Sequence, residues 1–151
     1  MNRDKQAKWM QFCVAGASLF STCDKRKYMS IILDGNDYVL GIGYNGGPKG
    51  MKHCSDGGCP RLQNNSAPGS IYDDCIAIHA EANAIMHSDF LGRGNGAKLF
   101  VNGIPCFSCA KLIVNSGISE IFVLRDSTRQ DWFDVKTFLL KNSINIETIE
   151  I

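Results

Sequence analysis

The pattern of hydrophobic and polar positions changes period along the chain and predicts alternating helices and strands. In residues 3–21 apolar side chains recur at helical spacing, which predicts an amphipathic first helix. Residues 29–33 and 38–42 are short β-rich runs on either side of Asp34–Asp37, so they predict a hairpin. By the same criteria we expect helices at 75–86, 105–117 and 132–140, and strands at 98–101, 120–124 and 144–149.

The order of these elements predicts an α/β protein with a central, mixed, five-stranded sheet and helices on its faces. Residues 44–74 interrupt the pattern, because they are polar and broken by Gly and Pro. A structureless stretch of this length is unusual in a compact domain unless it is functional or held in place by crosslinks. We therefore expect one domain, residues 1–151, with a cysteine-rich insert at about 51–75.

Net charge and hydropathy indicate which classes of binding partner are excluded. The chain has 151 residues and a net charge of +1, which argues against a polybasic surface for nucleic acid or an anionic membrane. No run approaches the ~18 apolar residues of a spanning helix, and the first twenty residues lack the apolar core of a signal peptide. We expect a cytoplasmic protein without nucleic-acid or membrane partners.

Two short segments carry the residues from which we expect chemistry. The first is His79-Ala80-Glu81, and the second begins at Pro105 and contains Cys106 and Cys109. Two thiolates three residues apart share a helical face. Together with one imidazole they give zinc three ligands, which leaves the open fourth position typical of a catalytic site. Pro105 suits the first turn of a helix, where partial positive charge favours the thiolates.

Glu81 is the expected proton carrier of this site. It lies two residues from His79, so it does not share the helical face of that ligand. It can still reach a water molecule beside the metal. Zinc lowers the pKa of water from ~16 toward ~7, and a neighbouring carboxylate can take the released proton and pass it to the substrate.

Three longer motifs resemble the deoxycytidylate (dCMP) deaminase family, within the cytidine deaminase-like fold. HAEANAI at 79–85 resembles that family's H-A-E-x-N-A-I, and GYNGGPKG at 43–50 resembles its G-Y-N-G-x-P-x-G. HCSDGGCPR at 53–61 is similar to a family branch with a cysteine-rich insert. The GYNG motif separates this family from the tRNA adenosine deaminases, which share the zinc motifs.

The resemblance implies a three-layer α-β-α fold and hydrolysis of dCMP to dUMP and ammonia, which supplies dUMP for thymidylate synthesis. It implies His79, Cys106 and Cys109 as zinc ligands. Glu81 would protonate N3 of the cytosine and then the amine that leaves C4.

Contacts with the nucleotide are also implied by the resemblance. Asn45 would hydrogen-bond the sugar or base, although an Asn before a Gly is also common in turns. Arg26 and Lys49 are the candidates for the 5′-phosphate, with solvated surface charge as the alternative for each. The chain departs from the family at 28–31, where Tyr28-Met29-Ser30-Ile31 replaces a run of small residues.

Regulation and assembly are implied by the same resemblance. Relatives that carry GYNG often form homohexamers, which are activated by dCTP with Mg²⁺ and inhibited by dTTP. Glycines allow backbone N–H groups to approach phosphate. The candidate residues for an allosteric triphosphate are therefore those of the Gly-rich loop: Gly43, Tyr44, Gly46, Gly47 and Gly50.

Four further cysteines bracket the irregular segment and lie on no apolar stripe. A closed four-ligand zinc site would tie this segment to the body of the protein. The expected ligands are Cys23, Cys54, Cys59 and Cys75, with His53 as a substitute for one of them. Scattered free thiols are the alternative. Cys13, on the first helix, is expected to be a buried apolar residue.

Two other classes of function stay open at this point. One is a deaminase of another base, such as cytidine, guanine or a tRNA adenosine, although near-neutral charge argues against a tRNA substrate. The other is a zinc module without activity that binds a partner. Glu81 favours an enzyme, because a purely structural zinc site has no use for a carboxylate at an open ligand position.

Overall fold

The computed structural model describes residues 1–65, 75–88, 96–124, 129 and 131–151. Its strands are β1 (Met29–Leu33), β2 (Val39–Tyr44), β3 (Ala97–Val101), β4 (Ile118–Leu124) and β5 (Asn145–Ile149). Its helices are α1 (Arg3–Phe20), α2 (Pro60–Gln63), α3 (Ala80–Met86), α4 (Phe107–Ser116) and α5 (Trp132–Lys141), with a 3₁₀ turn, η1, at Cys54–Asp56. None of the helices in these ranges is long and apolar enough to cross a membrane.

The strands form one mixed sheet in the order β2-β1-β3-β4-β5. β1 runs antiparallel to both β2 and β3, whereas β3, β4 and β5 are parallel. The carboxyl ends of β3 and β4 therefore lie at the same edge of the sheet as the start of β1 and the end of β2. Ligand sites in α/β proteins form at this kind of edge, beyond the carboxyl ends of the parallel strands.

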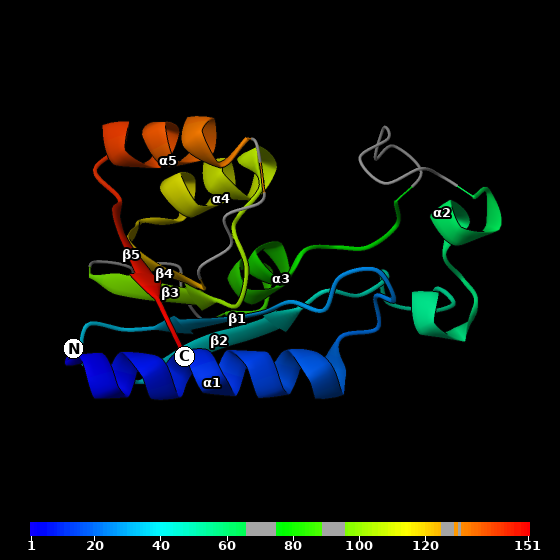
Figure 1. The fold of residues 1–151 in the computed structure, drawn as a ribbon, viewed down its shortest axis with the longest axis horizontal. Helices are drawn as coiled ribbons and strands as arrows, with labels where there is room; N and C mark the ends of the chain where they lie inside the picture. Colours follow the sequence, from blue (N-terminus) through cyan, green and yellow to red (C-terminus); the bar gives the residue numbers. More distant parts are fainter. Residues whose placement is uncertain (66–74, 89–95, 125–128, 130) are drawn as a thin grey trace.

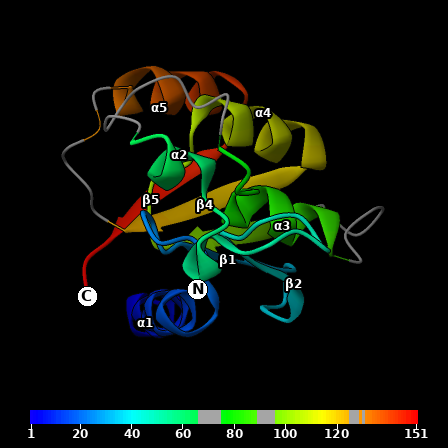
Figure 2. The same cartoon turned by 90° about the vertical axis from the view of Figure 1, so that its right-hand side faces the viewer.

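Helices cover both faces of the sheet and complete three layers (Figures 1 and 2). α1 lies alone on one face, where Met10, Cys13 and Ala17 pack against a stacked pair of sheet residues, Phe100 and Phe122. α3, α4 and α5 cover the other face and share a second apolar cluster with β3 and β4. The predicted α/β fold with a mixed five-stranded sheet is confirmed, and Cys13 is a buried core residue as expected.

Two predicted helix starts are wrong. The helix expected at 75–86 begins only at Ala80, because Ile78 is extended and exchanges backbone hydrogen bonds with Gly46 at 2.8 and 3.2 Å. The helix expected from Pro105 begins at Phe107, so Pro105 precedes the N-cap. The other boundaries differ from prediction by one or two residues, as is usual at the ends of elements.

The large residues at positions 28 and 29 occupy space left by two glycines. A Cβ atom placed on Gly16 of α1 would lie 2.1 Å from the sulfur of Met29. One placed on Gly103, in the loop after β3, would lie 2.6 Å from the ring of Tyr28. The larger residues that replace the family's small ones at positions 28 and 29 thus lie opposite glycines, which leave room for them.

The cysteine-rich segment is less irregular than expected. Within residues 51–65 the chain forms η1 and α2, which lie beyond one end of the sheet (Figure 1). Residues 66–74 of the predicted insert lie outside the described residues. Neither apolar cluster includes a residue from the described parts of 46–78, so the sheet's core does not extend into this segment.

Candidate metal centre

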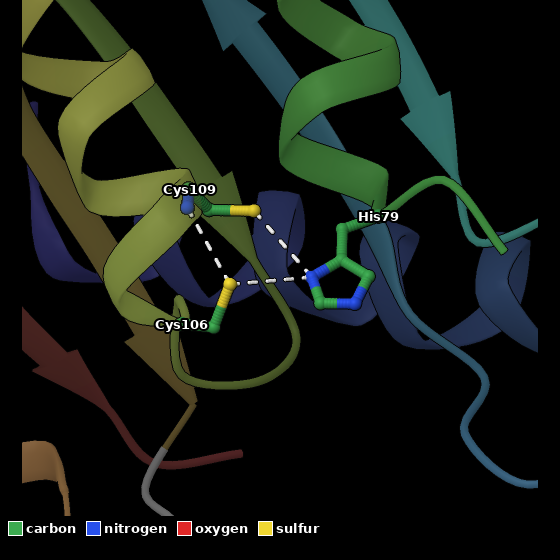
Figure 3. Close-up of side chains that lie close together, drawn as sticks. All are labelled: His79, Cys106 and Cys109. Atoms are coloured by element: carbon green, nitrogen blue, oxygen red, sulfur yellow. Dashed lines mark hydrogen bonds between the residues drawn. The ribbon is translucent and has the colours of Figure 1, made fainter. Parts of the chain in front are cut away.

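Three potential metal ligands meet at the starts of two neighbouring helices (Figure 3). His79 is the N-cap of α3, Cys106 is the N-cap of α4, and Cys109 lies in the first turn of α4. Residues at a helix start face unpaired backbone N–H groups and the positive end of the helix dipole. Both helices therefore direct partial positive charge toward the two sulfur atoms.

The ligand atoms are close enough to share one ion. The Nδ1 atom of His79 lies 3.4 Å from Cys106 Sγ and 3.5 Å from Cys109 Sγ. Within the described part of the chain, this is the one group of three such residues whose ligand atoms all lie within 4.8 Å of one another. Two sulfurs and an imidazole nitrogen are donors that suit zinc, and three protein ligands leave a fourth position open.

The pKa values of the two thiols shift in opposite directions. Hydrogen bonding from the Cys109 thiol is the largest cause that lowers the pKa of Cys106 to about 3, and His79 lowers it further. The backbone N–H of Cys109 also donates to Cys106 Sγ, at 3.4 Å. The pKa of Cys109 is raised, first by its hydrogen bond to Cys106 and then by burial. Cys106 is therefore the thiol that loses its proton more readily, and the thiolate is the form of cysteine that binds a metal ion.

Glu81 places a buried carboxyl group beside these ligands. It lies in the first turn of α3 and is only 3% exposed. Burial is the largest cause that raises its pKa, and a hydrogen bond with the Cys109 thiol acts in the opposite direction. A carboxyl group with a raised pKa can both accept and return a proton near neutral pH.

Asn45 anchors the start of α3. His79 makes no capping hydrogen bond with its own side chain. Instead Asn45 Oδ1 accepts a hydrogen bond from the buried N–H of Ala80, at 2.8 Å, and Asn45 Nδ2 donates to the carbonyl of Arg26, at 3.2 Å. One hydrogen of the Asn45 amide has a structural partner, and the predicted contact with a sugar or base would need the other.

Arg129 lies near the centre, and the sequence analysis missed it. Its NH1 group donates to the carbonyl of Ile104, at 2.6 Å, two residues before Cys106. Its Nε and NH2 groups donate to the Asp131 carboxylate, at 2.8 and 2.5 Å. Asp131 is the largest cause that raises the pKa of Arg129, and Cys106 and Tyr28 also contribute. The sequence signal that could have identified Arg129 is its position shortly after β4, because the carboxyl end of β4 lies at the edge of the sheet that carries the metal centre.

The predicted phosphate residues lie in different settings. Arg26 is exposed, and its NH1 group donates to the Tyr28 hydroxyl at 3.0 Å. Tyr28 packs over Gly103 and interacts electrostatically with Arg129, so Arg26 and Arg129 approach the same tyrosine. Lys49 is exposed in the loop after β2, and within the described residues no hydrogen bond or ion pair joins its side chain to the centre.

The glycines of the 43–50 run have structural roles of their own, and the run is not all loop as expected, because Gly43 and Tyr44 lie in β2. A Cβ atom on Gly43 would lie 2.2 Å from the backbone nitrogen of Ala84 in α3. Gly46 pairs with Ile78, and Gly50 has a φ of 84° that favours glycine. The predicted role of this loop in binding a triphosphate remains a prediction.

Comparison with known proteins agrees with this geometry. The sequence profile of the cytidine and deoxycytidylate deaminase zinc-binding region matches residues 3–125. A deoxycytidylate deaminase of Schizosaccharomyces pombe is 37% identical over 116 residues, which are 75% of this chain and 36% of the relative. One from Mycobacterium phage D29 is 34% identical over 134 residues, which are 84% of this chain and 100% of the relative.

A solved structure extends the comparison to the fold. The dCMP deaminase of cyanophage S-TIM5, in complex with dCMP and dUMP, superposes with a TM-score of 0.75 and 23% identity. The match covers 99% of both chains. The layers and the sheet are those of the cytidine deaminase-like fold. The chain belongs to the cytidine and deoxycytidylate deaminase family. It spans only about a third of the fission-yeast relative, 36%, but the whole of the phage relative.

Proposed function

We propose that this chain hydrolyses dCMP to dUMP and ammonia. The observation that carries the chemistry is the buried Glu81 carboxyl beside a His/Cys/Cys zinc centre. The choice of substrate is supported by the phage relative, a deoxycytidylate deaminase that this chain matches along its whole length. When bound, zinc supplies the Lewis acidity that makes a water molecule acidic enough to attack near neutral pH.

The residues of the chain hold the reactants and move the proton. His79, Cys106 and Cys109 would hold the ion, since their ligand atoms lie close together, and a zinc site with three protein ligands would keep a fourth position for water. Glu81 would take a proton from the water and deliver it to N3 of the cytosine. The same carboxyl group would then pass the second proton of the water to the amine nitrogen on C4, which leaves as ammonia.

Arg26 and Arg129 would recognise the 5′-phosphate of the substrate. The two guanidinium groups approach Tyr28 from different elements, and Arg129 is joined to the loop that carries Cys106. Arginine suits phosphate because its planar fork donates two parallel hydrogen bonds. Lys49 stays a weaker candidate, because it is exposed and, in the part of the chain that the structure describes, no hydrogen bond joins it to these arginines. Asn45 would orient the sugar or base with the remaining hydrogen of its amide.

A substrate comparison tests both halves of this proposal. Initial rates on dCMP, deoxycytidine, cytidine and guanine are measured for the wild-type chain and for Glu81→Gln, with zinc counted in each sample. We expect dCMP to be the preferred substrate, and Glu81→Gln to keep its zinc while losing about 10²–10⁴-fold in turnover. Equal rates on dCMP and deoxycytidine would contradict phosphate recognition, and an active Glu81→Gln variant would contradict the proton route.

Replacement of the arginines then assigns the phosphate contact. Arg129→Gln removes the charge and leaves a shorter, neutral side chain with an N–H donor group. We expect it to lower kcat/KM for dCMP by about 10-fold or more and to leave kcat/KM for deoxycytidine nearly unchanged, since a charge-assisted hydrogen bond contributes about 1.5–3 kcal/mol. Lys49→Gln is the matched control. Equal losses on both substrates would instead indicate that Arg129 acts by holding the Cys106 loop.

We also propose that the enzyme is a homohexamer, activated by dCTP with Mg²⁺ and inhibited by dTTP. Support comes from the Gly-rich run 43–50, in which Gly43, on β2, lies against α3, the helix that begins beside His79. A substrate-saturation curve that is sigmoidal, and becomes hyperbolic with dCTP and Mg²⁺, is the expected result. A hyperbolic curve that ignores both nucleotides would reject the regulation, and light scattering of the purified chain tests the hexamer.

A further inference from the structure

Asn102, the first residue after β3, uses both ends of its side-chain amide to bind the run of chain that leads into β1. Its Oδ1 atom accepts a hydrogen bond from the N–H of Met29 at 2.7 Å, and its Nδ2 atom donates to the carbonyl of Lys27 at 3.2 Å. The backbone N–H of Asn102 also donates to the carbonyl of Met29, at 3.4 Å. One residue therefore binds the backbone on both sides of Tyr28.

The opposite edge of the same run, residues 26–29, is bound by Asn45. The Nδ2 atom of Asn45 donates to the carbonyl of Arg26 at 3.2 Å, and its backbone N–H donates to the carbonyl of Tyr28 at 3.0 Å. The run is thus hydrogen-bonded on two sides, like a strand between two others. Side chains of an extended chain alternate between its faces. Because Met29 packs against α1, Arg26 and Tyr28 face the side of the sheet that carries α3 and α4.

This orientation brings the proposed phosphate contacts together beside the loop after β3. The NH1 group of Arg26 donates to the Tyr28 hydroxyl at 3.0 Å, and Tyr28 is one cause of the raised pKa of Arg129. The ring of Tyr28 lies against Gly103, where an added Cβ atom would be 2.6 Å from the ring. The carbonyl of Ile104 accepts the hydrogen bond from Arg129, at 2.6 Å. Successive residues of this loop therefore support both arginine-bearing parts of the group.

Asn102 acts where the backbone pairing between β1 and β3 ends. The last paired residues are Ser30 and Val101, and residues 21–28 belong to no helix or strand. Asn102 extends the contact beyond this pair with its side chain, which offers an acceptor and a donor at a fixed separation. Alanine at this position would remove both groups and leave the N–H of Met29 without its partner. The run 26–29 would then be held at one edge only.

We propose that Asn102 is a positioning residue for recognition of the substrate's 5′-phosphate. It acts through Arg26 and Tyr28, whose backbone it holds at a fixed place relative to the loop that leads to Cys106. The inference rests on the proposed function, because it takes dCMP as the substrate. A nucleoside without a phosphate makes no use of the arginines, so Asn102 should matter for dCMP and little for deoxycytidine. A misplacement of about 1 Å can cost about 100-fold in rate.

Steady-state kinetics of Asn102→Ala on dCMP and deoxycytidine test this role, with zinc counted in each sample. We expect kcat/KM for dCMP to fall by about 10-fold or more, mainly through a higher KM, because a contact with the phosphate is made before and during the reaction alike. The kcat/KM for deoxycytidine and the zinc content should be nearly unchanged. Asn142→Ala is the matched control, since Asn142 Nδ2 donates to the carbonyl of Phe138 at 2.8 Å, at the end of α5. This control should keep the wild-type preference for dCMP.

Calorimetric titration with dUMP and deoxyuridine makes the same comparison without turnover. We expect Asn102→Ala to lose affinity for dUMP by about the same factor as its KM for dCMP rises, and to bind deoxyuridine as the wild type does. Asn102→Ser, which keeps a small polar group, replaces Asn102→Ala in both measurements if the alanine variant does not fold.

The outcomes separate this inference from the proposed function. Equal losses on dCMP and deoxycytidine, or a loss of zinc, would indicate that Asn102 only supports the fold or the Cys106 loop, and would overturn its positioning role. A wild-type chain that prefers dCMP, together with a variant that keeps this preference, would refute the positioning role alone. A wild-type chain with equal rates on both substrates would refute the proposed phosphate recognition, and the role of Asn102 with it.

Discussion

Replacement of Gly43 by alanine should disturb the metal centre from outside it. Gly43 lies on β2 directly beneath α3, the helix that begins beside His79. An added Cβ atom would lie 2.2 Å from the nitrogen of Ala84 and 2.3 Å from the carbonyl oxygen of Ala80. Both are backbone atoms, so no side chain can rotate away. The helix as a whole must move off the strand.

The size of the effect follows from these distances. A normal contact needs about 3.4 Å, so α3 must shift by about 1 Å. Overpacking of this kind lowers the free energy of unfolding by roughly 1–3 kcal/mol. A loss of about 2 kcal/mol lowers the melting temperature of a chain of this size by roughly 4–8 °C. Metal bonds tolerate about 0.2 Å. A displaced His79 should therefore weaken zinc binding by about 10–100-fold, as loss of a supporting contact does.

The assay compares Gly43→Ala with Gly35→Ala, whose added Cβ atom meets nothing within 4 Å. Thermal unfolding followed by circular dichroism measures stability, and competition with a chromophoric chelator measures zinc affinity. If both variants melt together and bind zinc equally, α3 does not lie against β2 as described. If Gly43→Ala is less stable but binds zinc normally, the coupling between β2 and the metal ligands is refuted.

Three further perturbations have defined outcomes. Asn45→Ala leaves the buried N–H of Ala80 without a partner, which should lower the free energy of unfolding in urea by about 1–3 kcal/mol. An unchanged urea midpoint would contradict the role of Asn45 at the start of α3. In Asp37→Asn the left-handed backbone is retained but the charge is lost. Hydrogen bonds from Lys5, and then from Lys98, hold the pKa of Asp37 below its usual value. The ionised Asp37 therefore adds about 1 kcal/mol of stability above about pH 4, and this contribution is lost as the pH falls further. A stability difference between the wild type and Asp37→Asn that does not change with pH would contradict this. Removal of zinc with a chelator should lower the melting temperature of the wild-type chain, since an ion at 100 times its Kd adds about 2.7 kcal/mol.

The sequence predicts those parts of the fold whose signals are local. The periodicity of residues 3–21 predicts α1, and the apolar run Met29–Leu33 predicts a strand buried along its whole length. The metal centre could be predicted for the same reason. Its proposed ligands occur in two short motifs. Each motif lies at the start of a helix, and the two helix starts bring the histidine and cysteine side chains together.

The features that could not be predicted depend on contacts between distant segments. Residues 75–78 have helical character by composition, but pairing of Ile78 with Gly46 overrides that preference. Arg129 has no motif around it. It reaches the centre because β3 and β4 are parallel, so the chain leaves both strands at one edge of the sheet. A pattern within one segment contains no information about such an arrangement.

The packing of Met29 against Gly16 has a consequence for the evolution of the family. The sulfur of Met29 occupies the volume that a side chain at position 16 would need. A relative with a small residue at position 29 would leave a cavity beneath α1 unless position 16 carried a larger one. These two positions should therefore covary among relatives, with their summed volume nearly constant, although they lie on different elements of the fold. An alignment of relatives could test this constraint without any experiment on the protein.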